Sequence, residues 1–187
     1  LDTAARSLAL LNAKTKEEAA RLAGDLTALN QSRKALTEKG KEEAIRIIET
    51  TELKNDRVLV VYLPDCHESL AGIIAGRIRE KYHRPAFVLT GGETSAKGSG
   101  RSIESYSMYE ELVKCADLMI QFGGHPMAAG LSIEEKNIEE FRRRLNVNCT
   151  LTDEELRPKI VIDVPMPVSY ITKELVEQIS LLEPFGK

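Results

Sequence analysis

The sequence predicts an α/β fold, in which a mixed sheet flanked by helices occupies the middle of the chain. Residues 58–63 (VLVVYL) form an unbroken apolar run, which is typical of a central strand covered on both faces. A helical pattern follows, and residues 84–89 (RPAFVL) form a second strand with Pro85 near its start, where it removes no ladder donor. A strand, a helix and a strand within about 30 residues predict a βαβ unit.

A long helix is expected before this unit. Thr15 and Glu18 form a capping box, in which the Thr hydroxyl accepts a backbone N–H and the Glu side chain reaches back. Apolar residues then recur every three or four positions. An unbroken helix over 15–50 would be about 54 Å long at 1.5 Å per residue, and Gly40 is its expected break. Because helices this long and charged often bridge domains, residues 1–55 are predicted to be a helical connector.

Short elements are expected after the βαβ unit. Residues 96–103 (AKGSGRSI) are rich in glycine and predict an edge strand or a loop. A short helix is expected over 106–115. Residues 119–133 predict a tight glycine turn followed by a strand. Apolar residues at helical spacing over 138–145 then predict one more helix.

The last part of the chain predicts a separate segment. Residues 146–152 have the composition of a linker, and residues 159–163 (KIVID) predict the start of a new strand. A helix is expected over 172–182. We interpret Leu1, which follows neither an initiator Met nor a signal pattern, as an internal cut in a longer protein.

Composition bounds the class of protein. The net charge is −3 and no segment is a basic arm, so any contact with DNA must use a few placed residues. The three cysteines are too few and scattered for a disulfide framework, which favours a cytoplasmic location. No apolar run approaches the roughly 18–20 residues that span a membrane.

One polar segment has the chemistry of an anion clamp. Gly100 and its neighbouring glycine let backbone N–H groups approach a phosphate. Ser99 and Ser102 offer hydroxyls, and Arg101 offers a planar fork for two phosphate oxygens. The alternative is a β-bulge with an ordinary surface arginine, and the spacing leaves both interpretations open.

Two histidines are further candidates. His125 follows Gly123 and Gly124, and its imidazole could donate a hydrogen bond to phosphate. The alternative is a glycine turn with a partly exposed histidine. His67, at the start of a predicted helix, could face the same site or could serve only the fold.

No metal site is expected in this chain. Two-metal hydrolysis needs carboxylates and imidazoles that converge on ions about 3.5–4 Å apart, whereas the aspartates here are dispersed. The basic run at 142–144 lies on a predicted helix and is typical of a solvated face.

Four motifs resemble, in order, the DHHA1 domain of RecJ exonucleases: residues 67–77 (HESLAGIIAGR), Arg84-Pro85, residues 98–103 (GSGRSI) and residues 122–131 (FGGHPMAAGL). The resemblance implies a DHHA1-type substrate-binding domain over 56–149. It makes 1–55 the connector from an N-terminal DHH domain outside this chain, and 150–187 a linker and the start of an OB-fold region.

The resemblance also implies a function. In that family the DHH domain binds two Mn²⁺ or Mg²⁺ ions, and the DHHA1 domain holds single-stranded DNA. This chain is then the DNA-binding part of a 5′–3′ single-strand-specific exonuclease of DNA repair and recombination. It is expected to be monomeric, to bind no cofactor and to be inactive alone. Its repair partners, such as a helicase or a single-strand-binding protein, are left open.

Particular residues carry this implication. By motif, Ser99, Gly100, Arg101 and Ser102 are implied phosphate contacts. The loop of Gly123, Gly124 and His125 is implied to line the cleft opposite the metals, with His125 the one residue here that could act in catalysis. His67 is a further candidate contact.

Two other classes share these motifs. Oligonucleotide and cyclic-dinucleotide phosphodiesterases carry the glycine–histidine motif, but a long connector over 15–50 and an OB-like continuation count against them. Alanyl-tRNA synthetases and their editing relatives use a DHHA1-type domain as a nucleic-acid-binding module without nuclease function. Both alternatives remain open from the sequence.

Overall fold

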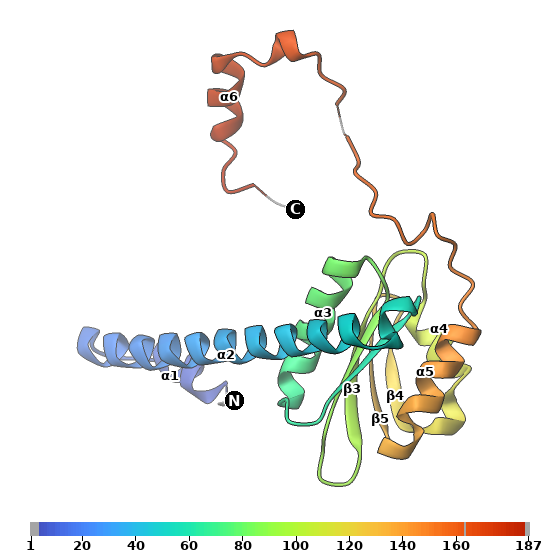
Figure 1. Ribbon diagram of the computed structural model, residues 1–187. Helices are drawn as coiled ribbons and strands as arrows, with labels where there is room; N and C mark the ends of the chain where they lie inside the picture. The colour runs from blue at the N-terminus through green and yellow to red at the C-terminus, as the bar shows by residue number, and fades with distance from the viewer. Residues whose placement is uncertain (1–3, 163, 186–187) are drawn as a thin grey trace. The chain divides into compact units, whose positions relative to one another are not determined.

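The computed structural model describes residues 4–162 and 164–185, and the chain divides into two compact units, 1–157 and 158–187. The first unit contains a five-stranded mixed sheet with the strand order β1-β2-β3-β5-β4 (Figure 1). In this sheet β1 and β2 are parallel, and the other pairs are antiparallel. The strands are β1 (Leu59–Leu63), β2 (Ala86–Thr90), β3 (Ala96–Arg101), β4 (Met119–His125) and β5 (Ala128–Ile133).

The predicted βαβ unit is confirmed: α3 (Glu68–Tyr82) connects β1 to the parallel strand β2. Side chains alternate between two cores, because successive residues of a strand face opposite sides of the sheet. Leu59 and Val88 pack with α3, whereas Val60 and Phe87 pack on the other side of the sheet. Helices α4 (Met108–Val113) and α5 (Ile138–Val147) cover that second side (Figure 1).

The glycine-rich segment forms β3, which lies in the middle of the sheet between β2 and β5, so the expected edge strand or loop is wrong. The glycines make room for large core side chains. A Cβ on Gly100 would lie 2.6 Å from both Met108 Sδ and Phe87 Cε1, and one on Gly98 would lie 3.2 Å from Leu131 and Leu89 carbons. The core therefore needs Gly100, and a Cβ on Gly98 would require the two leucine side chains to shift.

Helix α2 (Lys16–Thr50) is continuous, and the break expected at Gly40 is wrong. A Cβ on Gly40 would lie 2.6 Å from Ile74 Cδ1, so the glycine lets α2 approach α3 closely. Beyond this point Ala44 and Ile48 of α2 are fully buried against β1 and α3. The Thr15 hydroxyl accepts from the Glu18 N–H as expected, whereas the Glu18 carboxylate accepts from the Lys14 N–H, one residue before the cap. Helix α1 (Ala5–Leu11) packs on α2.

Strands β4 and β5 form a hairpin whose two-residue turn is Pro126-Met127. The predicted glycine turn is therefore misplaced, because Gly123 and Gly124 lie inside β4. The turn is held to the neighbouring loop by Ser102 N–H, which donates to Met127 O at 2.9 Å, and by an equal bond from Met108 N–H to Pro126 O.

The second unit holds α6 (Lys173–Ser180), capped by the Thr172 hydroxyl, where a helix was predicted. Its residues 159–162 form no strand, contrary to the expectation, and Asp163 lies outside the described residues. A strand needs a ladder partner, and none pairs with these residues in the described part of this unit. The 3₁₀ helices of the described chain are Glu52–Asn55, Ala116–Leu118, Glu135–Asn137 and Val168–Tyr170.

Candidate nucleic-acid interface

The strand register brings two of the sequence motifs together on one face of the sheet. In antiparallel pairs, directly opposite residues project to the same face. Ser99 lies opposite Gly130, which lies opposite Gly123, and Arg101 lies opposite Ala128, which lies opposite His125. We call these two neighbouring rows the open sheet face; its residues are Ser99, Gly130, Gly123, Arg101, Ala128 and His125.

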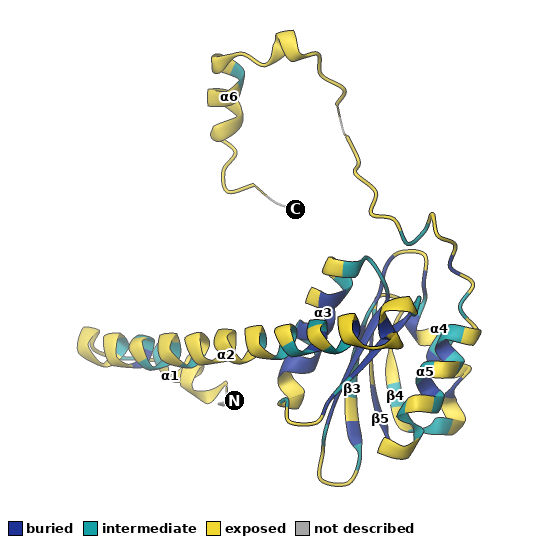
Figure 2. Cartoon of the chain, in the orientation of Figure 1, coloured by how far each residue is buried: buried dark blue, intermediate teal, exposed yellow. Residues whose placement is uncertain are grey.

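The open sheet face lies on the α3 side of the sheet. Ser99 and Arg101 lie opposite Val88 and Ala86 of β2, and these two pack in the core under α3. As far as the structure describes the chain, that core contains no residue of β3, β4 or β5. Residues 123–125 and Gly130 are exposed, as Figure 2 shows for much of β4. The sheet thus presents small and polar residues next to α3.

Arg101 carries the positive charge of this face. Its Nη1 donates to the Gly100 carbonyl oxygen at 2.8 Å. Its Nη2 lies beside Gly72 of α3, at the place where a Cβ would be only 2.8 Å away. Among the described residues, no carboxylate forms an ion pair with Arg101. The charge therefore remains available to an anionic ligand.

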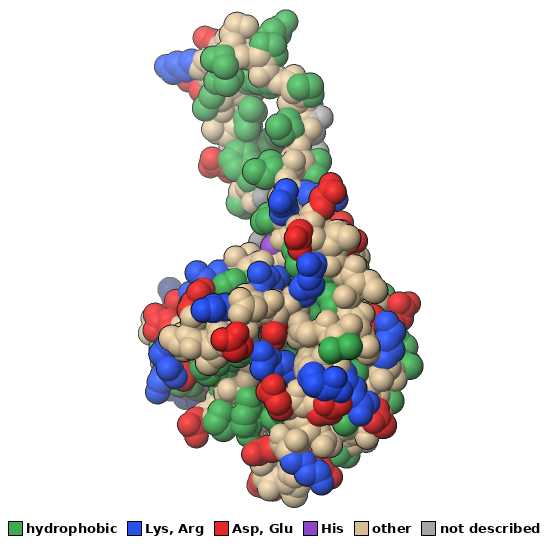
Figure 3. All heavy atoms as spheres, turned by 45° about the vertical axis from the view of Figure 1, so that its right-hand side comes forward, with side chains coloured by type: hydrophobic (Ala, Val, Ile, Leu, Met, Phe, Trp, Pro, Cys, Tyr) green, Lys and Arg blue, Asp and Glu red, His purple; other side chains and the backbone are tan. Residues whose placement is uncertain are grey.

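The arginines of α5 differ in this respect. Arg142 pairs with Asp56 at 2.6 Å, Arg143 with Glu140 at 2.7 Å and Arg144 with Asp117 at 2.7 Å. Hydrogen bonds from Arg143 and Arg144 lower the pKa of Glu140 to about 2. On the face seen in Figure 3, basic and acidic side chains are interspersed. This supports the prediction of a solvated face rather than a phosphate site.

His125 ends β4 at the exposed edge of the open sheet face. Its Nδ1 accepts a hydrogen bond from the Met127 N–H at 3.3 Å. When Nδ1 accepts, the neutral ring carries its proton on Nε2, which is then a donor. The turn that follows is anchored through both of its carbonyls. The ring is thus oriented by its own turn, and its Nε2 makes no hydrogen bond within the described chain.

Ser102 does not belong to this face. It is 1% exposed, and its hydroxyl donates to the Tyr106 carbonyl oxygen at 2.5 Å. The implied phosphate contact is therefore not available in this structure, and Ser102 supports the loop that holds the hairpin turn. Gly124 also serves the fold: its φ is +151°, and a Cβ there would meet the backbone of Ala128 and Ala129.

Two glycines of the open sheet face have no packing role. A Cβ on Gly123 would meet nothing within 4 Å, and one on Gly130 would meet only the Gly98 carbonyl oxygen at 3.8 Å. Glycine weakens a strand interior, and often marks a place where a ligand approaches the backbone. Gly130 was missed from the sequence, although its strand pairing with Ser99 identifies it once the register is known.

His67 and Lys97 lie near the start of α3. The His67 Nδ1 accepts from the Ser69 N–H at 3.2 Å and so caps the helix, which is a structural role. Lys97 lies two residues before Ser99 in β3 and therefore projects to the same face of the sheet. It pairs with Glu68 at 2.7 Å. The hydrogen bond between them raises the pKa of Lys97 and lowers that of Glu68. Lys97 was also missed from the sequence.

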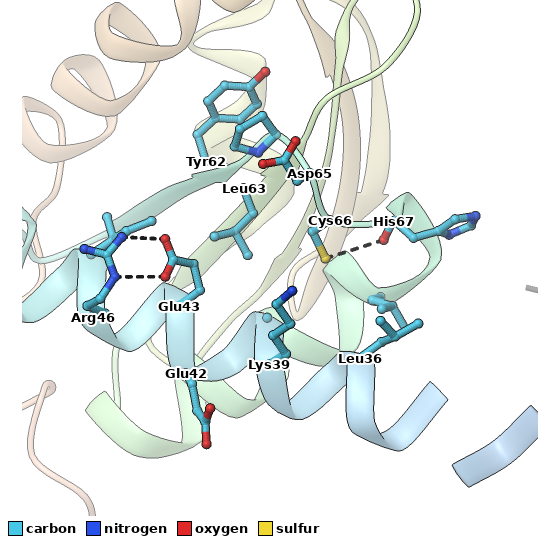
Figure 4. A pocket seen from close by; sticks show the side chains of 14 residues that line it. Leu36, Lys39, Glu42, Glu43, Arg46, Tyr62, Leu63, Asp65, Cys66 and His67 are labelled. Atoms are coloured by element: carbon cyan, nitrogen blue, oxygen red, sulfur yellow. Dashed lines mark hydrogen bonds and ion pairs between the residues drawn. The ribbon is translucent and has the colours of Figure 1, made fainter. Parts of the chain in front are cut away.

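A groove of about 650 Å³ lies between α2 and the loop from β1 to α3 (Figure 4). Of the candidate contact residues named from the sequence, its lining includes His67 alone among the described residues, and the His67 ring points away from the groove in Figure 4. Glu43 and Arg46 in its wall bind each other through two hydrogen bonds. The groove is also lined by Lys39, Glu42 and Asp65, so its wall carries both positive and negative charges. Such a wall is a poor match to a polyanion.

Among the described residues, no three His, Cys, Asp or Glu side chains converge in a way that could hold a metal ion. Nor does that part of the chain contain a helix both long and apolar enough to span a membrane.

The model of the DHHA1 domain family matches residues 55–150, which cover the whole sheet and α3 to α5. The chain belongs to the DHHA1 domain family. Around this DHHA1 domain the similarity extends further. The single-stranded-DNA-specific exonuclease RecJ of Bacillus subtilis is 35% identical over 95% of this chain. The chain corresponds to 23% of that relative, about a quarter of its length.

Solved structures agree with this assignment. The crystal structure of RecJ from Thermus thermophilus in complex with Mg²⁺ matches 98% of this chain and 28% of its own, with a TM-score of 0.82 and 29% identity. The same protein with Mn²⁺ matches 98% of this chain and 27% of its own, with a TM-score of 0.75 and 29% identity. The DHHA1 domain and its long helix thus have the fold found in RecJ.

Proposed function

We propose that this chain is the single-stranded-DNA-binding part of a RecJ-like 5′–3′ exonuclease, and that the open sheet face holds the DNA backbone near its 5′ end. One observation carries the proposal. The strand register places Ser99, Arg101 and His125 on one face, and within the described chain no carboxylate neutralises the charge of Arg101. The names of the similar proteins support the choice of substrate.

The chemistry of this face suits phosphate. The Arg101 guanidinium offers a planar fork for two phosphate oxygens, which binds more strongly than a neutral hydrogen bond. The Ser99 hydroxyl and the His125 Nε2–H are further donors in neighbouring rows. Contacts to phosphate carry no base information, so binding is independent of sequence.

Metal-dependent hydrolysis needs a cluster of metal ligands, and the described residues of this chain contain none. In the proposed full-length protein a DHH domain binds Mn²⁺ or Mg²⁺, which supplies the activated water. The chain alone then binds DNA without cleaving it. The proposal includes a monomeric, cytoplasmic protein that acts in DNA repair and recombination.

The substitution Arg101→Lys tests the phosphate contact. Lysine keeps the charge but loses the planar fork, so affinity for 5′-phosphorylated oligo-dT should fall by roughly 1–2 kcal/mol. Arg143→Lys is the matched control, because Arg143 is paired with Glu140 on α5, away from this face. Equilibrium fluorescence anisotropy measures both. Equal affinity of wild type and Arg101→Lys would mean that Arg101 is an ordinary surface charge. In a separate comparison, tighter binding of the chain to tRNA than to DNA would favour a non-nuclease RNA-binding module.

A further inference from the structure

Gly72 lies in the interior of α3, directly under the Arg101 side chain. A Cβ on Gly72 would lie 2.8 Å from Arg101 Nη2, 3.5 Å from Arg101 Cζ and 3.6 Å from Ser99 Cβ. Among residues that a helix interior tolerates, glycine is the least favourable. The neighbour that a Cβ on Gly72 would displace is therefore the arginine of the open sheet face rather than an apolar core residue.

The Arg101 guanidinium is held from two sides. Nη1 donates to the Gly100 carbonyl oxygen at 2.8 Å, and the Nη2 end rests against Gly72. The remaining N–H groups make no hydrogen bond within the described chain. The fork is thus positioned in advance and keeps donors for a ligand, an arrangement that lowers the cost of ordering a long side chain on binding.

We propose that Gly72 is a positioning residue: the absence of its Cβ lets Arg101 place its guanidinium where it binds the terminal phosphate of the DNA. The inference rests on the proposed function and deepens it. It predicts that a single methyl group on α3, which makes no contact with DNA itself, weakens recognition of that phosphate.

The fold should tolerate this methyl group. A distance of 2.8 Å is too short for a real Cβ contact, so something must move. The atom in the way is the far end of a long flexible side chain, which moves more readily than backbone or packed core. Alanine also favours the helix over glycine. Gly72→Ala should therefore keep or raise the melting temperature while it displaces Arg101.

The experiment is a double-mutant cycle on this chain. Dissociation constants are measured for wild type, Gly72→Ala, Arg101→Ala and the double variant, each with oligo-dT that carries a 5′-phosphate or a 5′-hydroxyl. Gly72→Ala should reduce the preference for the phosphate about tenfold, a difference of about 1.4 kcal/mol. In the Arg101→Ala background the same change should have no further effect.

Gly76→Ala is the matched control, because it lies one turn later in α3 and its Cβ would meet nothing within 4 Å. It should gain the same helix preference and keep the phosphate preference. The inference is overturned by an undiminished preference in Gly72→Ala, by an equal loss in Gly76→Ala, or by a full further loss in the Arg101→Ala background. Undiminished preference in Arg101→Ala itself contradicts the proposed function, and the inference with it.

Discussion

Replacement of His125 by alanine should lower single-turnover cleavage by the full-length protein by about 10²–10³, the usual cost of removing one transition-state donor. A phosphodiester transition state concentrates negative charge on its oxygens, and a donor that is already oriented stabilises it. The His125 ring meets this requirement, because its Nδ1 is occupied by the Met127 N–H and its Nε2 is free to donate.

The same substitution should leave the melting temperature almost unchanged. The side chain is exposed, and the turn keeps both of its anchoring bonds from Ser102 and Met108. Thermal melts and cleavage are measured on one preparation. His83→Asn is the control, since His83 directly follows α3 as its C-cap with a φ of 49°, a conformation that asparagine tolerates. A large melting shift together with normal cleavage would show that His125 serves only the fold.

Gly130→Val should lower cleavage by the full-length protein by about 10²-fold without loss of stability. The added side chain would stand between Ser99 and Gly123 and lift the DNA backbone from the sheet. A displacement of about 1 Å can cost that much in rate. Because a Cβ at Gly130 meets only one atom, at 3.8 Å, and valine favours strands, the melting temperature should stay equal or rise.

Gly130→Ala provides the graded comparison, since its single methyl group occupies less of the space above the sheet. Its cleavage rate should lie between those of wild type and Gly130→Val. Both variants are assayed by single-turnover cleavage and by melting. Wild-type rates in both would mean that DNA does not lie on this face.

Local patterns predicted the βαβ unit, the long helix and most helix positions, because these depend on periodicity and caps within one segment. Two of the errors at glycines have a different origin. Gly40 was expected to break a helix and Gly100 to lie in an edge strand or a loop, yet each makes room for a partner distant in the chain, Ile74 for the first and Phe87 and Met108 for the second. Such partners become known only with the tertiary packing.

The candidate site was predicted in the same partial way. The motifs identified Ser99, Arg101 and His125, but only the register shows that they share a face. Ser102 follows β3 and is buried. The motif, which treats four consecutive residues as one phosphate clamp, therefore wrongly counts Ser102 among the contacts. Gly72 acts from α3, and no spacing in the sequence links it to Arg101.

The position of DNA on the open sheet face is the central claim about this chain. Two-dimensional ¹H–¹⁵N NMR of the labelled chain, titrated with 5′-phosphorylated oligo-dT, tests this directly. We expect shifts of the amide signals of Ser99, Arg101, Gly123 and Gly130, with those of α5 unchanged. Shifts confined to α5, or to the groove between α2 and the loop from β1 to α3, would contradict it.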